Sequence, residues 1–136
     1  MDDFNTYGID ATACKVMILD DIPVNTRLLE KILETQKFQL SIFNNSTLAL
    51  ESLPQVRPDV ILLDIMMPGI DGLTFLTRVR EKPEYDSTRI IMISAVSESE
   101  EIIKAGKLGA NDYITKPINP KRVVECIYNQ LNQIKK

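Results

Sequence analysis

The sequence contains no histidine. Histidine is the commonest general base and a frequent metal ligand, because its pKa lies near neutral pH. Its absence excludes Ser-His and Cys-His catalysis and histidine-bound metal within this chain. Any chemistry must therefore use carboxylates, lysine, hydroxyl groups and the backbone.

Cysteine and long apolar runs are also scarce. Cys14 and Cys126 lie in apolar segments and lack metal-ligand spacing, so we interpret them as small core or edge residues rather than as a disulfide. No apolar run approaches the roughly 18 residues that span a bilayer, and the acidic N-terminus is unlike a signal peptide. We therefore expect a cytoplasmic protein without membrane contact.

The overall composition is that of an ordinary globular domain. The 136 residues are 44% hydrophobic and 26% charged, and the formal net charge is -3. This length suits one domain with a real core, and the charge gives no reason to expect nucleic-acid binding within the chain. Because the first residues lack periodicity, we expect a flexible leader over 1–13 and a single domain over 14–136.

Short apolar runs alternate with amphipathic segments along that domain. The runs that predict strands lie at 15–20, 38–43, 59–64, 89–94 and 112–117. Apolar residues at helical spacing predict helices near 24–36, 46–53, 73–82, 97–109 and 123–134. Ser46 is predicted to cap the second helix, which we expect to end at Leu53, before Pro54.

This order predicts the fold class. Continuous apolar strands joined by helices favour an α/β fold with a parallel sheet covered on both faces. Right-handed crossovers then give a doubly wound (βα)5 sandwich with a crevice at the carboxyl ends of the strands. The strand order 2-1-3-4-5 is one of two common solutions, and periodicity alone does not select it.

Polar residues mark the ends of four predicted strands. They are Asp20 and Asp21 after the first, Asp64 after the third, Ser94 after the fourth, and Thr115, Lys116 and Pro117 after the fifth. The second strand ends in nothing obviously chemical, which is consistent with a place at the sheet edge. Because these ends face one crevice, we expect three carboxylates, a hydroxyl and an ammonium group to converge there.

Three clustered carboxylates repel one another unless a cation lies among them. With oxygen ligands alone, the expected ion is Mg2+, or Mn2+ in its place. Lys116 and Ser94 would contact oxygens of a phosphoryl group, and a carboxylate can itself accept that group as an aspartyl-phosphate. The pattern therefore predicts a phosphoryl-transfer site.

Four segments together resemble the receiver domains of response regulators in two-component signalling, the CheY-like superfamily. They are ILDD at 18–21, DVILLDIMMPGIDG at 59–72, IIMISA at 90–95 and GANDYITKPI at 109–118. They occur in the family's order, and the resemblance covers about residues 14–134. It implies a flavodoxin-like sandwich with strand order 2-1-3-4-5.

The resemblance implies a role for each acid at the strand ends. Asp64 would be the phosphoacceptor. Asp20, Asp21 and Asp64 would hold Mg2+, together with the backbone carbonyl of Met66. Read without the resemblance, Asp21 could instead cap the following helix, and Asp20 could be a buried structural acid.

The resemblance also implies a conformational switch. Lys116 would contact the phosphoryl group, and a cis peptide is expected between Lys116 and Pro117. Ser94 and Tyr113 would be the switch residues that reshape the face formed by helix 4, strand 5 and helix 5. Taken singly, Ser94 could be a strand-end hydroxyl bonded to backbone, Lys116 a surface lysine and Tyr113 a packing residue.

The implied function is a phosphoacceptor rather than an enzyme. Its partners would be a histidine kinase or histidine phosphotransfer protein, a downstream effector or output domain, and a second copy in a phosphorylation-linked homodimer. We expect either a stand-alone regulator or a receiver cut from a longer protein.

Other function classes are less well supported. An aspartate-nucleophile phosphatase would need an acid where Met66 stands, and degenerate interaction modules typically lose an acid or the lysine that this chain keeps. No G-x-G-x-x-G follows the first strand, which disfavours dinucleotide binding.

Overall fold

The computed structural model describes residues 8–64, 72–95 and 100–134. Its strands are β1 (Lys15–Leu19), β2 (Gln39–Phe43), β3 (Val60–Asp64), β4 (Arg89–Ser94) and β5 (Asp112–Thr115). All neighbouring strands pair in parallel, in the order β2-β1-β3-β4-β5. Both the predicted fold class and the strand order are confirmed.

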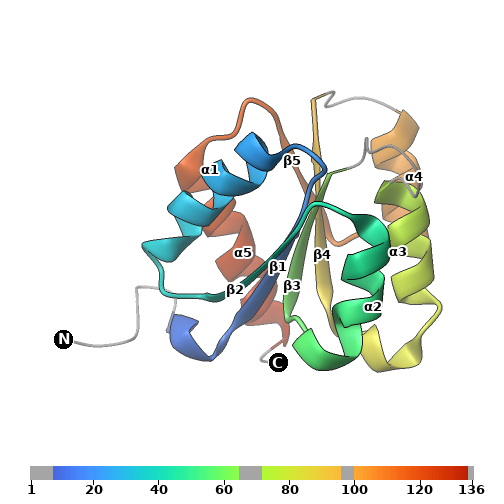
Figure 1. Cartoon of the computed structure of the whole chain (residues 1–136), viewed down its shortest axis with the longest axis horizontal. Helices are drawn as coiled ribbons and strands as arrows, with labels where there is room; N and C mark the ends of the chain where they lie inside the picture. Colours follow the sequence, from blue (N-terminus) through green and yellow to red (C-terminus); the bar gives the residue numbers. More distant parts are fainter. Residues whose placement is uncertain (1–7, 65–71, 96–99, 135–136) are drawn as a thin grey trace.

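Five helices cover the sheet on its two faces. They are α1 (Pro23–Glu34), α2 (Ser46–Val56), α3 (Gly72–Arg80), α4 (Glu100–Leu108) and α5 (Pro120–Ile134). Helices α1 and α5 lie on one face, and α2, α3 and α4 lie on the other (Figure 1). The connections thus form the doubly wound sandwich that brings the strand ends to a common edge.

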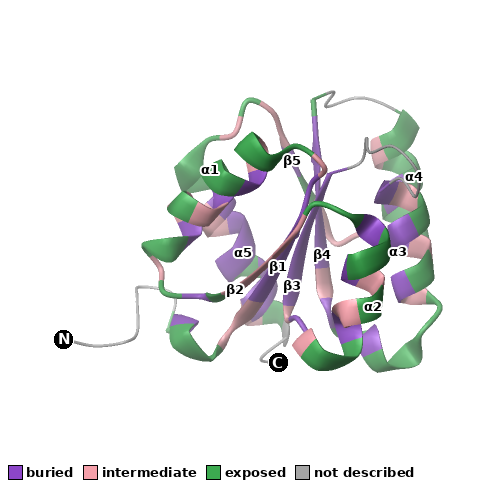
Figure 2. Ribbon diagram, in the orientation of Figure 1, coloured by how far each residue is buried: buried purple, intermediate pink, exposed green. Residues whose placement is uncertain are grey.

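The core has two layers because side chains alternate along each strand. In β1, Val16 and Ile18 belong to the cluster under α1 and α5, whereas Met17 and Leu19 belong to the cluster under α2, α3 and α4. Strand β3 is buried along its whole length, with helices on both of its faces (Figure 2). Burial on both faces explains why β3 is an almost unbroken apolar run that ends in one acid.

Helix α2 differs from the prediction at both ends. Asn45, not Ser46, is its N-cap, and the Asn45 side chain accepts a hydrogen bond from the Leu48 N–H at 3.0 Å. The helix also continues through Pro54 to Val56. Proline removes one N–H, but the closing bond from the Arg57 N–H to the Leu53 carbonyl is kept at 2.9 Å.

Part of the segment predicted as a flexible leader packs against the domain. Ile9 and Ala11 are buried in the cluster under α1 and α5. Asp10 caps a short 3-10 helix at Ala11–Ala13 by accepting the Thr12 N–H at 3.0 Å. This packing differs from a loose segment over 1–13; residues 1–7 lie outside the described residues.

Both cysteines are free thiols, Cys126 buried and Cys14 half-buried. Burial, reinforced by a hydrogen bond to the Asp112 carboxylate, raises the pKa of Cys126 to about 12, so this thiol stays protonated at neutral pH. Across the described helices, none is both long and apolar enough to cross a membrane.

Candidate functional site

The carboxyl ends of the central strands bring the predicted acids together. Leu19 of β1 pairs with Leu63 of β3, so Asp20 and Asp64, one residue further along each strand, lie at the same level. Both residues are buried, with 2% and 4% of their surface exposed. The parallel register thus joins residues that are far apart in the sequence.

Asp20, Asp21 and Asp64 form one carboxylate cluster. One oxygen from each of the three side chains lies within 4.8 Å of the others. The three predicted side-chain ligands therefore converge. Met66, predicted to add its backbone carbonyl, lies outside the described residues.

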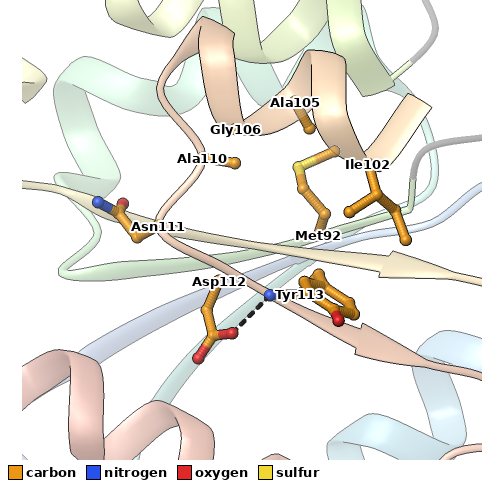
Figure 3. Close-up of a pocket in the computed structure, with 8 residues that line it drawn as sticks. All are labelled: Met92, Ile102, Ala105, Gly106, Ala110, Asn111, Asp112 and Tyr113. Carbon is orange, nitrogen blue, oxygen red and sulfur yellow. Dashed lines mark hydrogen bonds between the residues drawn. The ribbon is translucent and has the colours of Figure 1, made fainter. Parts of the chain in front are cut away.

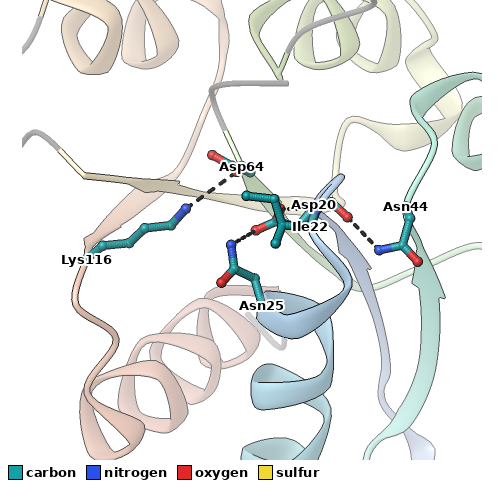
Figure 4. Close-up of polar contacts among 6 residues, drawn as sticks. All are labelled: Asp20, Ile22, Asn25, Asn44, Asp64 and Lys116. Atoms are coloured by element: carbon teal, nitrogen blue, oxygen red, sulfur yellow. Dashed lines mark hydrogen bonds and ion pairs between the residues drawn. The ribbon is translucent and has the colours of Figure 1, made fainter. Parts of the chain in front are cut away.

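Lys116 supplies a positive charge at this cluster. Its Nζ lies 3.5 Å from Oδ2 of Asp64, and its side chain is 27% exposed (Figure 4). The peptide between Lys116 and Pro117 is cis, as predicted. One ammonium group does not balance three carboxylates, so the cluster keeps a net negative charge.

Hydrogen bonds hold both the side chain and the backbone of Asp20. Its Oδ1 accepts the Ile22 N–H at 2.9 Å, and its Oδ2 accepts the Asn25 side-chain amide at 3.1 Å. Its carbonyl accepts the Asn44 side-chain amide at 2.7 Å (Figure 4). Its own N–H donates to the Phe43 carbonyl at 3.2 Å.

Asn25 and Asn44 were not predicted as site residues. Asn44 directly follows β2, and although it adds no charged or nucleophilic group there, its side chain supports the Asp20 backbone. Asn44 could have been identified from its position, because it directly follows β2 as Asp20 directly follows β1. Asn25 had a weaker signal, a polar residue in the first turn of the helix after the acids.

Asp21 has a different environment from Asp20. Its Oδ1 is buried and has no hydrogen-bond partner among the described residues. It does not cap α1 either, since the N-cap is Ile22 and no side chain caps that helix. A buried unpaired oxygen costs about 1–3 kcal/mol, which a bound cation would relieve. The all-oxygen donor set fits Mg2+.

The predicted switch residues lie at different depths. Ser94 is buried at the tip of β4, and its carbonyl accepts the Lys116 N–H at 2.8 Å. Tyr113 on β5 is 41% exposed. It lines a cavity of about 320 Å3 between α4 and β5, together with Met92 and Ile102 (Figure 3). There is thus free volume beside the Tyr113 ring.

Comparison with protein families gives one assignment for most of the chain. The sequence model of the response regulator receiver domain matches residues 16–128. This range contains the three aspartates, Ser94, Tyr113 and Lys116.

Two longer proteins each contain a segment that is similar to this chain. A protein-glutamate methylesterase/protein-glutamine glutaminase from Trichodesmium erythraeum is 38% identical over 124 residues, which cover 86% of this chain and 35% of that protein. The response regulator PleD from Caulobacter vibrioides is 34% identical over 107 residues, 79% of this chain and 24% of that protein. The chain thus spans about a third and about a quarter of their lengths.

Solved structures show the same architecture. The chemotaxis protein CheY4 of Vibrio cholerae superposes with a TM-score of 0.81 at 25% identity, covering 85% of this chain and 97% of that chain. The receiver domain of a signal transduction histidine kinase from Syntrophus aciditrophicus gives a TM-score of 0.83 at 27% identity, covering 91% and 94% of the two chains.

Proposed function

The chain belongs to the response regulator receiver domain family, and we propose that it accepts a phosphoryl group on Asp64 in a Mg2+-dependent way. The observation that carries the proposal is the cluster of Asp20, Asp21 and Asp64 with Lys116 3.5 Å from Asp64. A buried carboxylate beside a lysine, within a cluster of carboxylates that could hold a cation, suits a phosphoryl acceptor.

The donor in this proposal is a phosphohistidine outside these 136 residues, none of which is a histidine. A carboxylate oxygen of Asp64 attacks the phosphorus, so that a P–O bond forms while the P–N bond breaks. The electron pair of the broken bond stays on the imidazole nitrogen, which takes up a proton as it leaves. A histidine kinase or a histidine phosphotransfer protein fits this role.

Four residues assist the proposed transfer. Asp21, whose buried oxygen has no partner among the described residues, is best suited to bind Mg2+ directly, with Asp20 and Asp64 beside it. The bound ion would neutralise charge on the phosphoryl oxygens as a Lewis acid. Lys116 would contact one of these oxygens and the Ser94 hydroxyl another, which stabilises charge during in-line transfer.

The proposed output is a change of shape on the face formed by α4, β5 and α5. A phosphoryl group on Asp64 would draw the Ser94 hydroxyl toward it, and Tyr113 would turn into the cavity beside it. A downstream effector, an output domain or a second copy would read the new surface. We place this signalling role in the cytoplasm and assign the chain no turnover of its own.

The test is phosphorylation by a small donor. The protein is incubated with acetyl phosphate and Mg2+, and intact mass spectrometry measures the addition of one phosphoryl group. We expect the adduct in the wild type and in Asp86→Asn, which changes an exposed acid before β4, at the end of that strand opposite Ser94. We expect none in Asp64→Asn or in excess EDTA. An unmodified wild type, or an Asp64→Asn variant modified to the same extent, would overturn the proposal.

A further inference from the structure

We propose that Asn25 is a positioning residue for the cation site, holding the Asp20 carboxylate in place before the ion binds. This inference rests on the proposed function, in which the carboxylate cluster binds Mg2+. Asn25 lies in the first turn of α1, and its amide nitrogen donates to Oδ2 of Asp20 at 3.1 Å (Figure 4).

Asn25 and the backbone hold the two oxygens of Asp20 separately. The Ile22 N–H donates to Oδ1 at 2.9 Å, and Asn25 donates to Oδ2. Two donors on different oxygens fix the plane of the carboxylate. Each oxygen has two lone pairs, so each keeps one for a cation or for a water molecule bound to it.

The chemistry of the donor suits this task. An amide N–H carries no net charge, so it orients the carboxylate without cancelling the negative charge that attracts a cation. A lysine or arginine at this position would form an ion pair with Asp20 and compete with the ion. Asn25 therefore positions the ligand and keeps its charge.

Asn25 is not needed to hold the backbone at this turn. The Asp20 carbonyl is bound by Asn44 at 2.7 Å, and the Asp20 N–H by the Phe43 carbonyl at 3.2 Å. Removal of the Asn25 amide therefore frees only the Asp20 side chain. Nor does Asn25 cap its helix, in contrast to Asn45, whose side chain accepts the Leu48 N–H.

The test compares Mg2+ affinity with stability in the absence of Mg2+. Asn25→Leu replaces the amide by an apolar group of similar size, and Asn25→Ala removes it without adding bulk. Asn129→Leu and Asn129→Ala make the same changes at an exposed position of α5. Titration calorimetry on EDTA-treated protein gives the Mg2+ dissociation constant, and urea unfolding in EDTA gives the stability.

We expect both Asn25 variants to raise the Mg2+ dissociation constant about 10-fold or more, as is typical for residues that orient metal ligands. Their stability in EDTA should fall below that of the corresponding Asn129 variants, because Oδ2 of the buried Asp20 loses its donor, but both variants should stay folded under the titration conditions. An unchanged dissociation constant would overturn the inference. So would a stability loss in EDTA large enough to leave the variants partly unfolded during the titration, since unfolding alone would then explain the weaker binding.

The wild type separates this inference from the proposed function. If wild-type protein releases no heat with Mg2+ and gains no phosphoryl group, the proposed function fails. If the wild type binds Mg2+ and is phosphorylated while the Asn25 variants bind equally well, only the role of Asn25 fails.

Discussion

Asp20 and Asp21 are neighbours in the chain, but their carboxylates have opposite surroundings. Both oxygens of Asp20 accept a hydrogen bond, whereas Oδ1 of Asp21 is buried with no partner among the described residues. In the absence of a cation, Asp21 therefore contributes repulsion and an unpaired buried oxygen. With a cation bound, the same oxygen becomes a ligand.

This asymmetry predicts that Asp21→Asn changes stability in opposite directions with and without Mg2+. In EDTA the variant loses one of three clustered negative charges, so its unfolding free energy should exceed that of the wild type by about 1 kcal/mol. In excess Mg2+ the wild type gains binding energy that the amide cannot match, and the order should reverse. Urea unfolding followed by circular dichroism measures both values.

Asp86→Asn, on an exposed turn, is the control: it loses an attraction to Arg80, so its effect on the unfolding free energy should be the same in EDTA and in Mg2+. If Asp21→Asn and the wild type keep the same order in EDTA and in Mg2+, then Asp21 is not the ligand that its environment suggests.

At the scale of the elements, one glycine lies inside α4 and another directly after it, and the two have different structural roles. Gly106 lies inside the helix, and a Cβ built on it would meet nothing within 4 Å. Gly109 follows the helix with φ +112°, and a Cβ there would lie 2.9 Å from Cγ of Arg80. Arg80 also donates to the Gly109 carbonyl at 3.0 Å, so its side chain is not free to move away.

We therefore predict opposite effects of alanine at the two glycines. Gly106→Ala should raise the unfolding free energy by about 0.5–1 kcal/mol, because glycine inside a helix costs conformational entropy. Gly109→Ala should lower it by about 1–3 kcal/mol, because alanine is strained at this φ and meets Arg80. Thermal and urea unfolding in one buffer measure both. A lower unfolding free energy for Gly106→Ala would contradict this prediction and would show that the open space beside the helix contributes to stability.

The differences from the sequence prediction are mostly found at the ends of elements. Asn45 and Ser46 are both good N-cap residues, and which one caps α2 depends on the backbone entering the helix. Pro54 is a strong break signal, but its missing N–H costs less near the end of a helix than in its middle. The donor of Asn44 faces Asp20 only once β2 pairs with β1, and that of Asn25 only once the turn into α1 has formed, so neither contact follows from residue type and spacing alone.

At the scale of the whole molecule, the fold could be predicted from the sequence because each central strand is buried on both faces. That burial demands continuous apolar runs, and an acid at the end of such a run stands out. Periodicity could not predict the strand order, which was instead implied by the resemblance to receiver domains. The convergence of the acids followed from the parallel sheet, whereas the hydrogen bonds that orient them depend on side-chain geometry.

The helices on one face of the sheet are not buried to the same extent. Helix α3 buries Gly72, Phe75, Leu76 and Val79, whereas Ala105 alone is buried in α4. The cavity beside Tyr113 lies between this loosely packed helix and β5. Because few apolar contacts hold α4, it is the element most easily moved by a change at the neighbouring strand tip.

Phosphorylation of Asp64 should therefore change amide hydrogen exchange in α4 and β5 while leaving that of α1 and α2 unchanged. The expected route is the Ser94 hydroxyl, because Ser94 is buried at the tip of β4, and β4 pairs with β3, which ends in Asp64, and with β5. Hydrogen exchange with mass spectrometry, with and without acetyl phosphate and Mg2+, measures the change peptide by peptide.

The Ser94→Ala variant separates the chemical step from the conformational response. It keeps the three carboxylates and Lys116, so it should still gain a phosphoryl group, but the exchange change in α4 and β5 should be lost. Ser87→Ala, at an exposed position, should respond like the wild type. If phosphorylated Ser94→Ala shows the wild-type exchange pattern, the signal reaches α4 without the Ser94 hydroxyl, and the proposed switch is wrong.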